Sequence, residues 1–362
     1  MTAKTVIKRI LIALLALLLT LVTVAGGYIA YVLIDDHRLP DDVPLTVEGA
    51  AAGVAPTGQA LDIVSYNIGF AAYTPDFGFF MDGGTESRAA SPESVHAVMA
   101  GIGDVLARGD YDFLLVEEVD KDATRSHHID QTALLGAAFA DYHRSFVVNY
   151  DSPYLFYPFN EPHGKSLSGM LTFSRFAMSQ SVRRSLPVED SLLKLVDLDR
   201  CYSVTHIPTD NGRELVLYTV HLSAYTSDGT IATKQLELLL ADMRSEYEKG
   251  NYTVCGGDFN KDLLGDSSRY FGVSGEAYTW AQPFPTAMLE GSGLTLQAPL
   301  DEKNPVPSCR NADGPYHEGQ FVLTVDGFIV SDNVTVTASS VLDLDFAYSD
   351  HNPVTMTFIL EP

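Results

Sequence analysis

The sequence predicts an α/β sandwich, in which one sheet packs on another with helices outside, preceded by a single membrane-spanning helix. Three observations support this prediction. Many short runs rich in β-branched and aromatic residues alternate with turn residues. Only two amphipathic helical stretches are clear, and many strands with few helices favour stacked sheets over a doubly wound fold. An uncharged apolar run near the N-terminus stands apart from the rest of the chain.

The apolar run extends from Ile10 to Ile34 and follows Lys4, Lys8 and Arg9. A bilayer needs roughly 20 apolar residues, so this run is long enough to cross one. A cleaved signal peptide is the alternative, but its apolar stretch is usually only about 7–15 residues long. Because the basic residues precede the span, the positive-inside rule predicts a cytoplasmic N-terminus and an extracytoplasmic domain, anchored to the cell membrane by a single pass.

The chain is therefore expected to have four segments. Residues 1–9 form a basic cytoplasmic N-terminus, and residues 10–34 form the transmembrane signal anchor. Residues 35–59, rich in Pro, Gly, Ala and acidic residues, are predicted to be a linker. Residues 60–362 contain no second linker and no internal repeat, which favours one large domain.

Within this domain the strands are chosen for β-branched and aromatic content between turn residues. They are Leu61–Asn67, Phe113–Glu117, Ser145–Val148, Gly169–Phe173, Leu215–His221, Tyr252–Cys255, Phe321–Val330, Val334–Ala338 and Val354–Ile359.

The two predicted helices carry recognisable end signals. One begins at Ser91, a capping residue, with Pro92 at the first helical position. The other runs from about Thr230 to Glu248, and Gly250 lies just past its end. Both place apolar residues along one face, which is typical of helices that cover a sheet.

The chain is acidic, with a formal net charge of −24, and it has no run of Lys or Arg in the predicted domain. Tight nucleic-acid binding, which uses a basic patch to neutralise phosphates, is therefore disfavoured. The three cysteines are too few for a disulfide-dense scaffold. Cys255 is expected to be a buried small residue, and a Cys201–Cys309 bridge is left open. No protein partner follows from the sequence.

Polar residues recur where the predicted strands end, which is where a site assembled from many segments takes its groups. Asn67 closes one strand, although Asn is also a common turn former. Glu117 and Glu118 close another. On alternating faces of a strand, only one of these two carboxylates is expected to point into a site. His221 ends a third strand, where a lone histidine usually has a structural role.

Three further segments follow the same rule. Asp258 and Asn260 project from a tight loop after two glycines, where an Asx turn is the alternative interpretation. Asp326 lies inside an apolar run, and a buried carboxylate is costly unless it is paired or hydrogen-bonded. Asp350 and His351 precede the last strand.

In their order along the chain these segments resemble the endonuclease/exonuclease/phosphatase superfamily. That superfamily includes nucleases, neutral sphingomyelinases and inositol polyphosphate 5-phosphatases. The matching segments are SYNIG, DFLLVEEV, SGMLTFSR, YTVHL, GGDFN, VDGFIV and SDHNPV. They span most of the predicted domain, and the combination of GGDFN with SDHNPV is specific.

The resemblance implies a four-layered α/β sandwich of two central mixed β-sheets flanked by helices, with the site at one edge. It also implies a bound divalent cation, expected to be Mg²⁺ or Mn²⁺. Glu118 would be the principal ligand, with Asn67 and Asp350 beside it. Mg²⁺ prefers one or two carboxylates plus waters, which agrees with this set.

The remaining residues would act on the phosphate ester. By resemblance, Asp258 and Asn260 would lie beside the scissile phosphate, and His221 would donate to a phosphoryl oxygen. Asp326 would orient His351 as a base, because a partner on one ring nitrogen sets the tautomer. Either His351 or Asp258 could activate the attacking water, and the sequence does not choose between them.

The chain departs from the family pattern at two positions. Many relatives place Gln before the metal-binding Glu, whereas this chain has Glu117. Several nucleases carry a carboxylate or Asn two residues beyond the first Asn, whereas this chain has Gly69. The second departure weakens a strict nuclease interpretation. Arg175, in SGMLTFSR, is a candidate phosphate contact, although an Arg after a strand is often a solvated surface charge.

The sequence therefore predicts a membrane-anchored phosphoesterase that uses water to cleave phosphate monoesters or diesters. Anchoring and acidity favour a lipid headgroup or small phosphate ester. A nuclease of the same superfamily and a non-catalytic binding module on the same fold are the alternatives. An aromatic stretch, residues 150–159, is a candidate rim for lipid or a stacked base, and core packing is the other interpretation. Lys165, Lys194 and Arg200 are the nearest basic candidates for a phosphate clamp.

Overall fold

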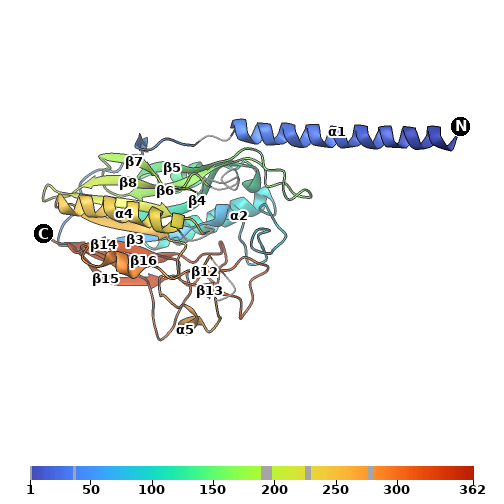
Figure 1. The fold of residues 1–362 in the computed structure, drawn as a ribbon. Coiled ribbons are helices and arrows are strands. Elements are labelled where there is room, and N and C mark those ends of the chain that lie inside the picture. Colours follow the sequence, from blue (N-terminus) through green and yellow to red (C-terminus); the bar gives the residue numbers. More distant parts are fainter. Residues whose placement is uncertain (1, 36–37, 189–197, 225–229, 276–279) are drawn as a thin grey trace.

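Several strands carry apolar residues on both faces, so each must be covered by a layer on either side. In β3 (Ala60–Asn67), Leu61 and Ile63 face one way, whereas Val64 and Tyr66 face the other, and all four are buried. The computed structural model, which describes residues 2–35, 38–188, 198–224, 230–275 and 280–362, supplies both layers. Two seven-stranded mixed sheets stack face to face with helices outside them (Figure 1), which confirms the predicted four-layered sandwich.

The first sheet combines strands from the N-terminal half of the domain with the last two strands of the chain. Its order is β15 (Val334–Val341), β16 (Val354–Leu360), β3, β4 (Phe113–Ala123), β6 (Ser166–Ser174), β5 (His143–Asp151) and β2 (Val47–Glu48). β3 and β4 run parallel, and their neighbours are antiparallel to them.

The second sheet packs on the first. Its order is β1 (Val43–Pro44), β7 (Gln180–Ser185), β8 (Cys201–Pro208), β9 (Glu214–His221), β10 (Tyr252–Asp258), β14 (Asp326–Ser331) and β11 (Leu294–Gln297). β9 and β10 are parallel, and β14 is antiparallel to β10. A separate two-stranded ribbon pairs β12 (Cys309–Arg310) with β13 (Val322–Leu323).

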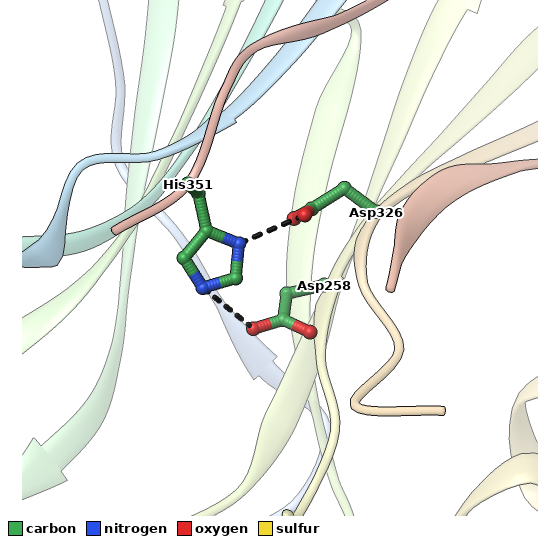
Figure 2. A group of neighbouring side chains, drawn as sticks. All are labelled: Asp258, Asp326 and His351. Carbon is green, nitrogen blue, oxygen red and sulfur yellow. Dashed lines mark hydrogen bonds and ion pairs between the residues drawn. The ribbon is translucent and has the colours of Figure 1, made fainter. Parts of the chain in front are cut away.

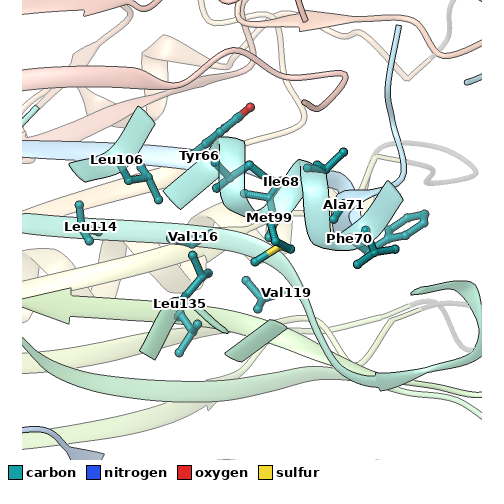
Figure 3. Close-up of a cluster of buried hydrophobic side chains, with 14 of the residues drawn as sticks. Tyr66, Ile68, Phe70, Ala71, Met99, Leu106, Leu114, Val116, Val119 and Leu135 are labelled. Atoms are coloured by element: carbon teal, nitrogen blue, oxygen red, sulfur yellow. The ribbon is translucent and has the colours of Figure 1, made fainter. Parts of the chain in front are cut away.

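Helices cover the two outer faces. On the first sheet, α2 (Pro92–Arg108) starts at the predicted cap, where Ser91 accepts a hydrogen bond from the Ser94 N–H. Its buried face packs with residues of β3 and β4 (Figure 3) and with α3 (Gln131–Ala138). On the second sheet, α4 (Thr230–Glu248) buries its predicted apolar face. The short helices are η1 (Gly69–Ala71), η2 (Thr124–Ser126), α5 (Ser268–Phe271) and η4 (Thr286–Leu289).

Some strands differ from the prediction. The run predicted as one strand over 321–330 is divided into β13 and β14, which belong to different sheets. β7, β8 and β11 were not predicted. In β8, the inward-facing residues Ser203 and Thr205 are buried, and they bond to other hydroxyls between the sheets. Because these positions are polar, the strand lacks the apolar content on which the prediction depends.

The N-terminal helix α1 (Ala3–Asp35) contains the predicted span and projects from the domain (Figure 1). Among the described residues it is the one helix that is long and apolar enough to cross a membrane. Its apolar side chains are exposed, apart from Val32, so the protein itself does not bury this surface.

The segment predicted as a linker differs from expectation from Val43 onward. β1 adds to the edge of the second sheet, and β2 adds to the edge of the first. Ala55 is fully buried, and its N–H donates to the Pro208 carbonyl. This segment therefore belongs to the folded domain, because its backbone groups complete both sheet edges.

The cysteines are all free and buried. Cys201 packs with Val147 and Met170, whereas Cys309 lies beside His351. The two are therefore not bridged. Cys255 is a buried core residue, as predicted.

A truncation tests whether residues 43–59 stabilise the domain. A soluble form that starts at Ala60 loses both edge strands and the buried Ala55, whereas one that starts at Arg38 keeps them. We expect the shorter form to be less stable by about 2 kcal/mol or more, a fall in Tm of about 4 °C. Differential scanning calorimetry measures this, and equal Tm values would show that the segment is a spacer.

A glycine pair tests the close approach of β9 and β10. A Cβ at Gly257 would lie 1.9 Å from the Val220 carbonyl oxygen, and its φ of +147° is unfavourable for other residues. Gly257→Ala should therefore cost about 3 kcal/mol or more in urea unfolding. The matched control is Gly103→Ala, in α2, where a Cβ meets nothing within 4 Å. That change should be neutral or stabilise by up to about 1 kcal/mol.

Candidate active site

The site lies at one edge of both sheets because of strand direction. The parallel strands β3 and β4 of the first sheet end at this edge, as do β9 and β10 of the second. The antiparallel strands β14 and β16 begin there. The predicted polar residues therefore meet although they are far apart in the sequence. The predicted residues that meet here are Asn67, Glu118, His221, Asp258, Asn260, Asp326, Asp350 and His351.

Asp258, the last residue of β10, is central to the site. In register it pairs with His221 on β9 and Asp326 on β14. Its Oδ2 lies 3.6 Å from His221 Nε2 and 3.8 Å from His351 Nε2, and it accepts a hydrogen bond of 3.2 Å from Asn67 Nδ2. This one carboxylate therefore joins residues from both sheets.

His351 is held by Asp326 (Figure 2). The Nδ1 of the ring lies 2.8 Å from Asp326 Oδ2, and the ring turns its Nε2 toward Asp258. Ser308 fixes the carboxylate, since its Oγ donates to the same Asp326 oxygen over 2.7 Å. The backbone N–H of Asp326 donates to Ser308 in return. The arrangement sets the orientation of the histidine through two hydrogen bonds.

A β-bulge decides which of the two adjacent glutamates enters the site. The register of β4 against β6 shifts between Val116 and Val119, and Glu118 has a left-handed φ of +54°. The side chain of Glu118 therefore reaches the site edge. Its Oε1 accepts a hydrogen bond of 3.3 Å from Asn67 Nδ2 and lies 3.9 Å from His221 Nε2.

Glu117 points the other way, into the space between the sheets. It is fully buried and accepts a hydrogen bond of 2.9 Å from Ser65 Oγ, while its second oxygen has no partner. Burial raises the pKa of Glu117 well above its usual range, and the nearby Asp326 carboxylate raises it further. The upward shift favours the neutral form of Glu117, which lies beneath the site, and Glu118 is the candidate ligand.

Two residues of GGDFN form a tight turn at the end of β10. The Asn260 N–H donates to Asp258 Oδ1 over 2.8 Å, as an Asx turn requires, and Asn260 has a left-handed φ of +48°. The side-chain amide of Asn260 donates to the Leu222 carbonyl next to His221. The Asx turn is therefore part of the functional site, because it holds Asp258 in place.

Buried charges shift the pKa values of the site residues. Burial raises the pKa of Asp258 to about 7, and Asp326 adds to the rise while His351 opposes it. Burial also raises the pKa of Glu118, against the effect of Arg125. Burial lowers the pKa of His351, but the Asp326 carboxylate and the neighbouring Cys309 together raise it by more, and the net shift is well upward. These shifts follow from closely spaced acids in a poorly solvated edge.

His221 shifts in the opposite direction. Burial and the positive charge of Arg200 lower its pKa well below the usual range. Within the described part of the chain, its Nδ1 has no hydrogen-bond partner. His221 is therefore neutral at neutral pH, whereas the upward pKa shift of His351 favours its protonated form.

Gly69 occupies the position where several nucleases of the family carry a polar side chain. A Cβ there would lie 2.7 Å from the Tyr73 ring and 3.1 Å from Asp350 Oδ1. Gly69 also has a φ of +50°. Asp350, which accepts from Ser349 Oγ, fills the space that such a side chain would need.

The predicted basic residues are not part of this group. Arg175 lies at the opposite end of β6 from Gly169, which pairs next to Glu118, and it bonds to Asp110 and Tyr142. Arg175 therefore does not reach the site, because it follows the wrong end of its strand. Lys165 is exposed and lies near Asp35. Lys194 lies outside the described residues.

Arg200 lies nearer the site, as it precedes β8 at the edge where β9 ends. It is buried, and its Nη1 donates to the His221 carbonyl over 3.3 Å. Its Nε has no hydrogen-bond partner among the residues that the structure describes. Arg200 therefore contributes positive charge close to His221.

Two cations near the site were not predicted. Arg125 is buried, forms a two-pronged pair with Asp120 and stacks 3.8 Å above the Phe70 ring. Its charge acts on Glu118. Lys261 follows Asn260, and burial lowers its pKa against the pull of Asp258. In the sequence, Arg125 and Lys261 each follow an acidic motif, but their spacing from that motif is not distinctive enough to predict a place near the site.

The donor set fits a hard divalent cation. Asp258, Asp326 and His351 offer ligand atoms within 4.8 Å of one another, and Glu118 shares the Asn67 amide with Asp258. Carboxylate oxygens at this density need a positive partner, and oxygen donors suit Mg²⁺ or Mn²⁺. The Asn67 Oδ1 accepts from the Gly69 N–H, so this amide presents nitrogen to the carboxylates. Ligation by Asn67 would require the amide to turn.

Comparison with known proteins identifies the family to which this chain belongs. The family match supports a hydrolase of the phosphoesterase and nuclease class. The sequence profile of the endonuclease/exonuclease/phosphatase family matches residues 64–351, so the chain belongs to that family, and the resemblance in its motifs is confirmed. No match exists among curated protein sequences.

Solved structures share the fold at low identity. An endonuclease/exonuclease/phosphatase from Beutenbergia cavernae is 19% identical, with a TM-score of 0.57, over 84% of this chain and 72% of its own. ANGEL2, a 2′,3′-cyclic phosphatase, is 16% identical, with a TM-score of 0.55, over 88% and 99%. The human nocturnin catalytic domain is 15% identical, with a TM-score of 0.53, over 87% and 96%.

The raised pKa of Asp258 predicts that the ionised form of this residue lowers the stability of the fold. A carboxyl with a pKa near 7 in the folded state stabilises the fold when protonated, and this contribution is lost as pH rises through 7. Asp258→Asn should therefore raise Tm at pH 8, and the gain should shrink as pH falls to 5. Asp104→Asn, at an exposed position on α2, should change Tm at neither pH. Thermal melts without metal measure both, and a lower Tm for Asp258→Asn at pH 8 would contradict this account.

Proposed function

We propose that this protein is a membrane-anchored, extracytoplasmic phosphoesterase that needs a divalent cation and hydrolyses phosphate monoesters or diesters by water attack. The observation that carries the proposal is the convergence of Glu118, Asp258, His221 and the His351–Asp326 pair at one sheet edge. Membership of the endonuclease/exonuclease/phosphatase family supports the same chemistry.

Glu118 would hold the cation, with Asp350 and the turned amide of Asn67 as further candidate ligands. Mg²⁺ or Mn²⁺ bound there would neutralise charge that develops on a phosphoryl oxygen during in-line displacement. The protonated His351, fixed by Asp326, would donate from Nε2 to the phosphate. The neutral His221, at the end of β9, would donate a second hydrogen bond to the phosphate.

Asp258 is the better candidate for the base. Its carboxylate lies among His221, His351 and Asn67, which leaves it close to every group that would hold the phosphate. Burial brings its pKa to about 7, where a carboxylate accepts a proton more readily than an ordinary aspartate does. The nearby Asp326 carboxylate raises the pKa of His351 well above the usual range, which favours the protonated ring and makes His351 less suited to accept a proton.

The favoured substrate class is a lipid headgroup or another small phosphate ester. A net charge of −24 repels polyanions, so tight binding of nucleic acid is disfavoured. The anchor keeps the domain at a membrane surface, where lipid phosphate is abundant. The positive charges of Arg125 and Lys261 would offset the acidic site locally for one phosphate group.

The proposal predicts that hydrolysis needs metal and His351. The full chain in detergent is assayed with Mg²⁺, Mn²⁺ or EDTA against sphingomyelin, inositol phosphates, plasmid DNA and a chromogenic phosphodiester. EDTA should abolish turnover of the preferred substrate. His351→Ala should lower kcat by about 100-fold or more.

The matched control is His96→Ala, which removes an exposed histidine on α2 and should leave kcat unchanged. Activity that survives both EDTA and His351→Ala would sink the proposed site. A folded protein that binds Mg²⁺ and cleaves none of these substrates would favour a binding module on the same fold.

A further inference from the structure

Exposed apolar side chains outside α1 gather at one place. Six large apolar residues of the described domain are exposed, and four belong to two neighbouring loops. Phe159 is 85% exposed, Tyr157 62%, Met81 56% and Phe156 50%. We call these four residues the aromatic rim. Soluble surfaces rarely group such side chains, so the rim indicates a binding surface.

The loop that carries the rim is fixed in place. Ser87 N–H donates to Glu161 Oε2 over 3.1 Å, and Arg88 Nε donates to the Pro162 carbonyl over 2.6 Å. The Phe80 ring packs on Tyr157 at 5.7 Å, which joins the Met81 loop to the aromatic one. The residues from 152 to 160 carry no charge. These contacts therefore hold the aromatic rim in its exposed position.

The same loop contacts the outer part of α1. Tyr28 OH donates to the Tyr154 carbonyl over 3.1 Å, and the Tyr154 N–H donates to Tyr31 OH over 3.0 Å. The Tyr28 and Phe156 rings meet edge to face at 5.1 Å. Lys165 Nζ lies 3.5 Å from Asp35 at the end of the helix. The rim is thus held at the level of Tyr28 and Tyr31.

That level is the outer membrane–water boundary if α1 spans a bilayer. A hydrocarbon core of about 30 Å corresponds to about 20 helical residues at 1.5 Å each. Counted from Ile10, the core then ends near Ala30, between the two tyrosines. Tyr and Trp are enriched at this depth because the ring is apolar and the polar group reaches water. Phe156, Tyr157 and Phe159 lie beside them.

The rim also shares an edge with the site. Its loop connects the end of β5 to the start of β6, and Gly169 in β6 pairs with Val119, next to Glu118. Arg125 beside Glu118 donates to Ser168 on the same strand. Whatever surface the rim contacts therefore lies against the edge that holds Glu118.

We propose that the aromatic rim rests in the outer leaflet of the membrane that α1 spans and turns the active-site edge toward that leaflet. The proposal rests on the membrane anchoring proposed above and narrows the substrate to a phosphate ester carried by a lipid of the same bilayer. The rim contributes apolar burial without charge, so it suits a zwitterionic surface better than an anionic one, which would repel this acidic domain.

The depth of residue 159 in the bilayer tests the proposal directly. The full chain is reconstituted into phosphatidylcholine vesicles that contain brominated lipids, which quench tryptophan at a known depth. Phe159→Trp should be quenched more than the wild type, whose single Trp280 supplies the baseline. Leu238→Trp, at an exposed apolar position on α4, should show no added quenching. Equal, unquenched emission from both variants would overturn the proposal.

Hydrolysis assays with a lipid substrate and a soluble substrate distinguish a role of the aromatic rim in membrane contact from a role in the reaction itself. Phe159→Ser should lower hydrolysis of a phospholipid in vesicles about tenfold and change hydrolysis of a soluble chromogenic phosphodiester by less than about twofold. Leu238→Ser should change neither. Equal loss on both substrates would overturn the proposal, as would loss confined to single-stranded oligonucleotides, which would assign the rim to base stacking. If the wild type cleaves nothing, the phosphoesterase proposal fails, and quenching still decides the position of the rim.

Discussion

The site depends on how closely the two sheets approach each other at one edge. A Cβ at Gly256 would lie 2.7 Å from Leu115 Cδ1 and 2.8 Å from the Phe328 ring, so this position admits no side chain without repacking. Leu115 precedes Glu117 on the first sheet, and Gly256 precedes Asp258 on the second. The buried layer of Leu61, Ile63, Leu115, Leu217, Val254 and Phe328 thereby places the ends of both sheets opposite each other. Asn67 and Asp258 can then share a hydrogen bond across sheets.

The same approach explains why the site is costly to build. Acidic groups from both sheets meet where little water reaches, so Glu117 and Asp258 keep protons at higher pH than ordinary carboxyls do. The surrounding core compensates for this unfavourable burial, because an apolar layer fills the space between the sheets and two more lie beneath the covering helices. The site itself is electrostatically unfavourable although the whole domain is stable, and a bound cation would relieve the repulsion among its carboxylates.

The N-terminal region gives the domain a defined relation to its helix. Because residues 43–59 complete the edges of both sheets, little chain is left between α1 and the folded domain. The contacts of Tyr28 and Tyr31 with the loop after β5 restrict it further. A connection of this length limits how far the domain can turn relative to α1. If α1 spans a membrane as proposed, the fold itself sets which face of the domain is turned toward that membrane.

The sequence by itself determined the fold class, the apolar span, both long helices and the set of polar residues that meet at the edge. Each is a local signal: a cap at Ser91, an apolar period, or an acid that ends a strand. The family resemblance pointed to Glu118, and the tertiary structure supplies the physical reason that Glu118 and not Glu117 faces the site: a bulge interrupts the alternation of β4. Tertiary structure alone excluded Arg175 and brought in Arg125, because a charge is near or far according to strand pairing, which residue spacing does not reveal.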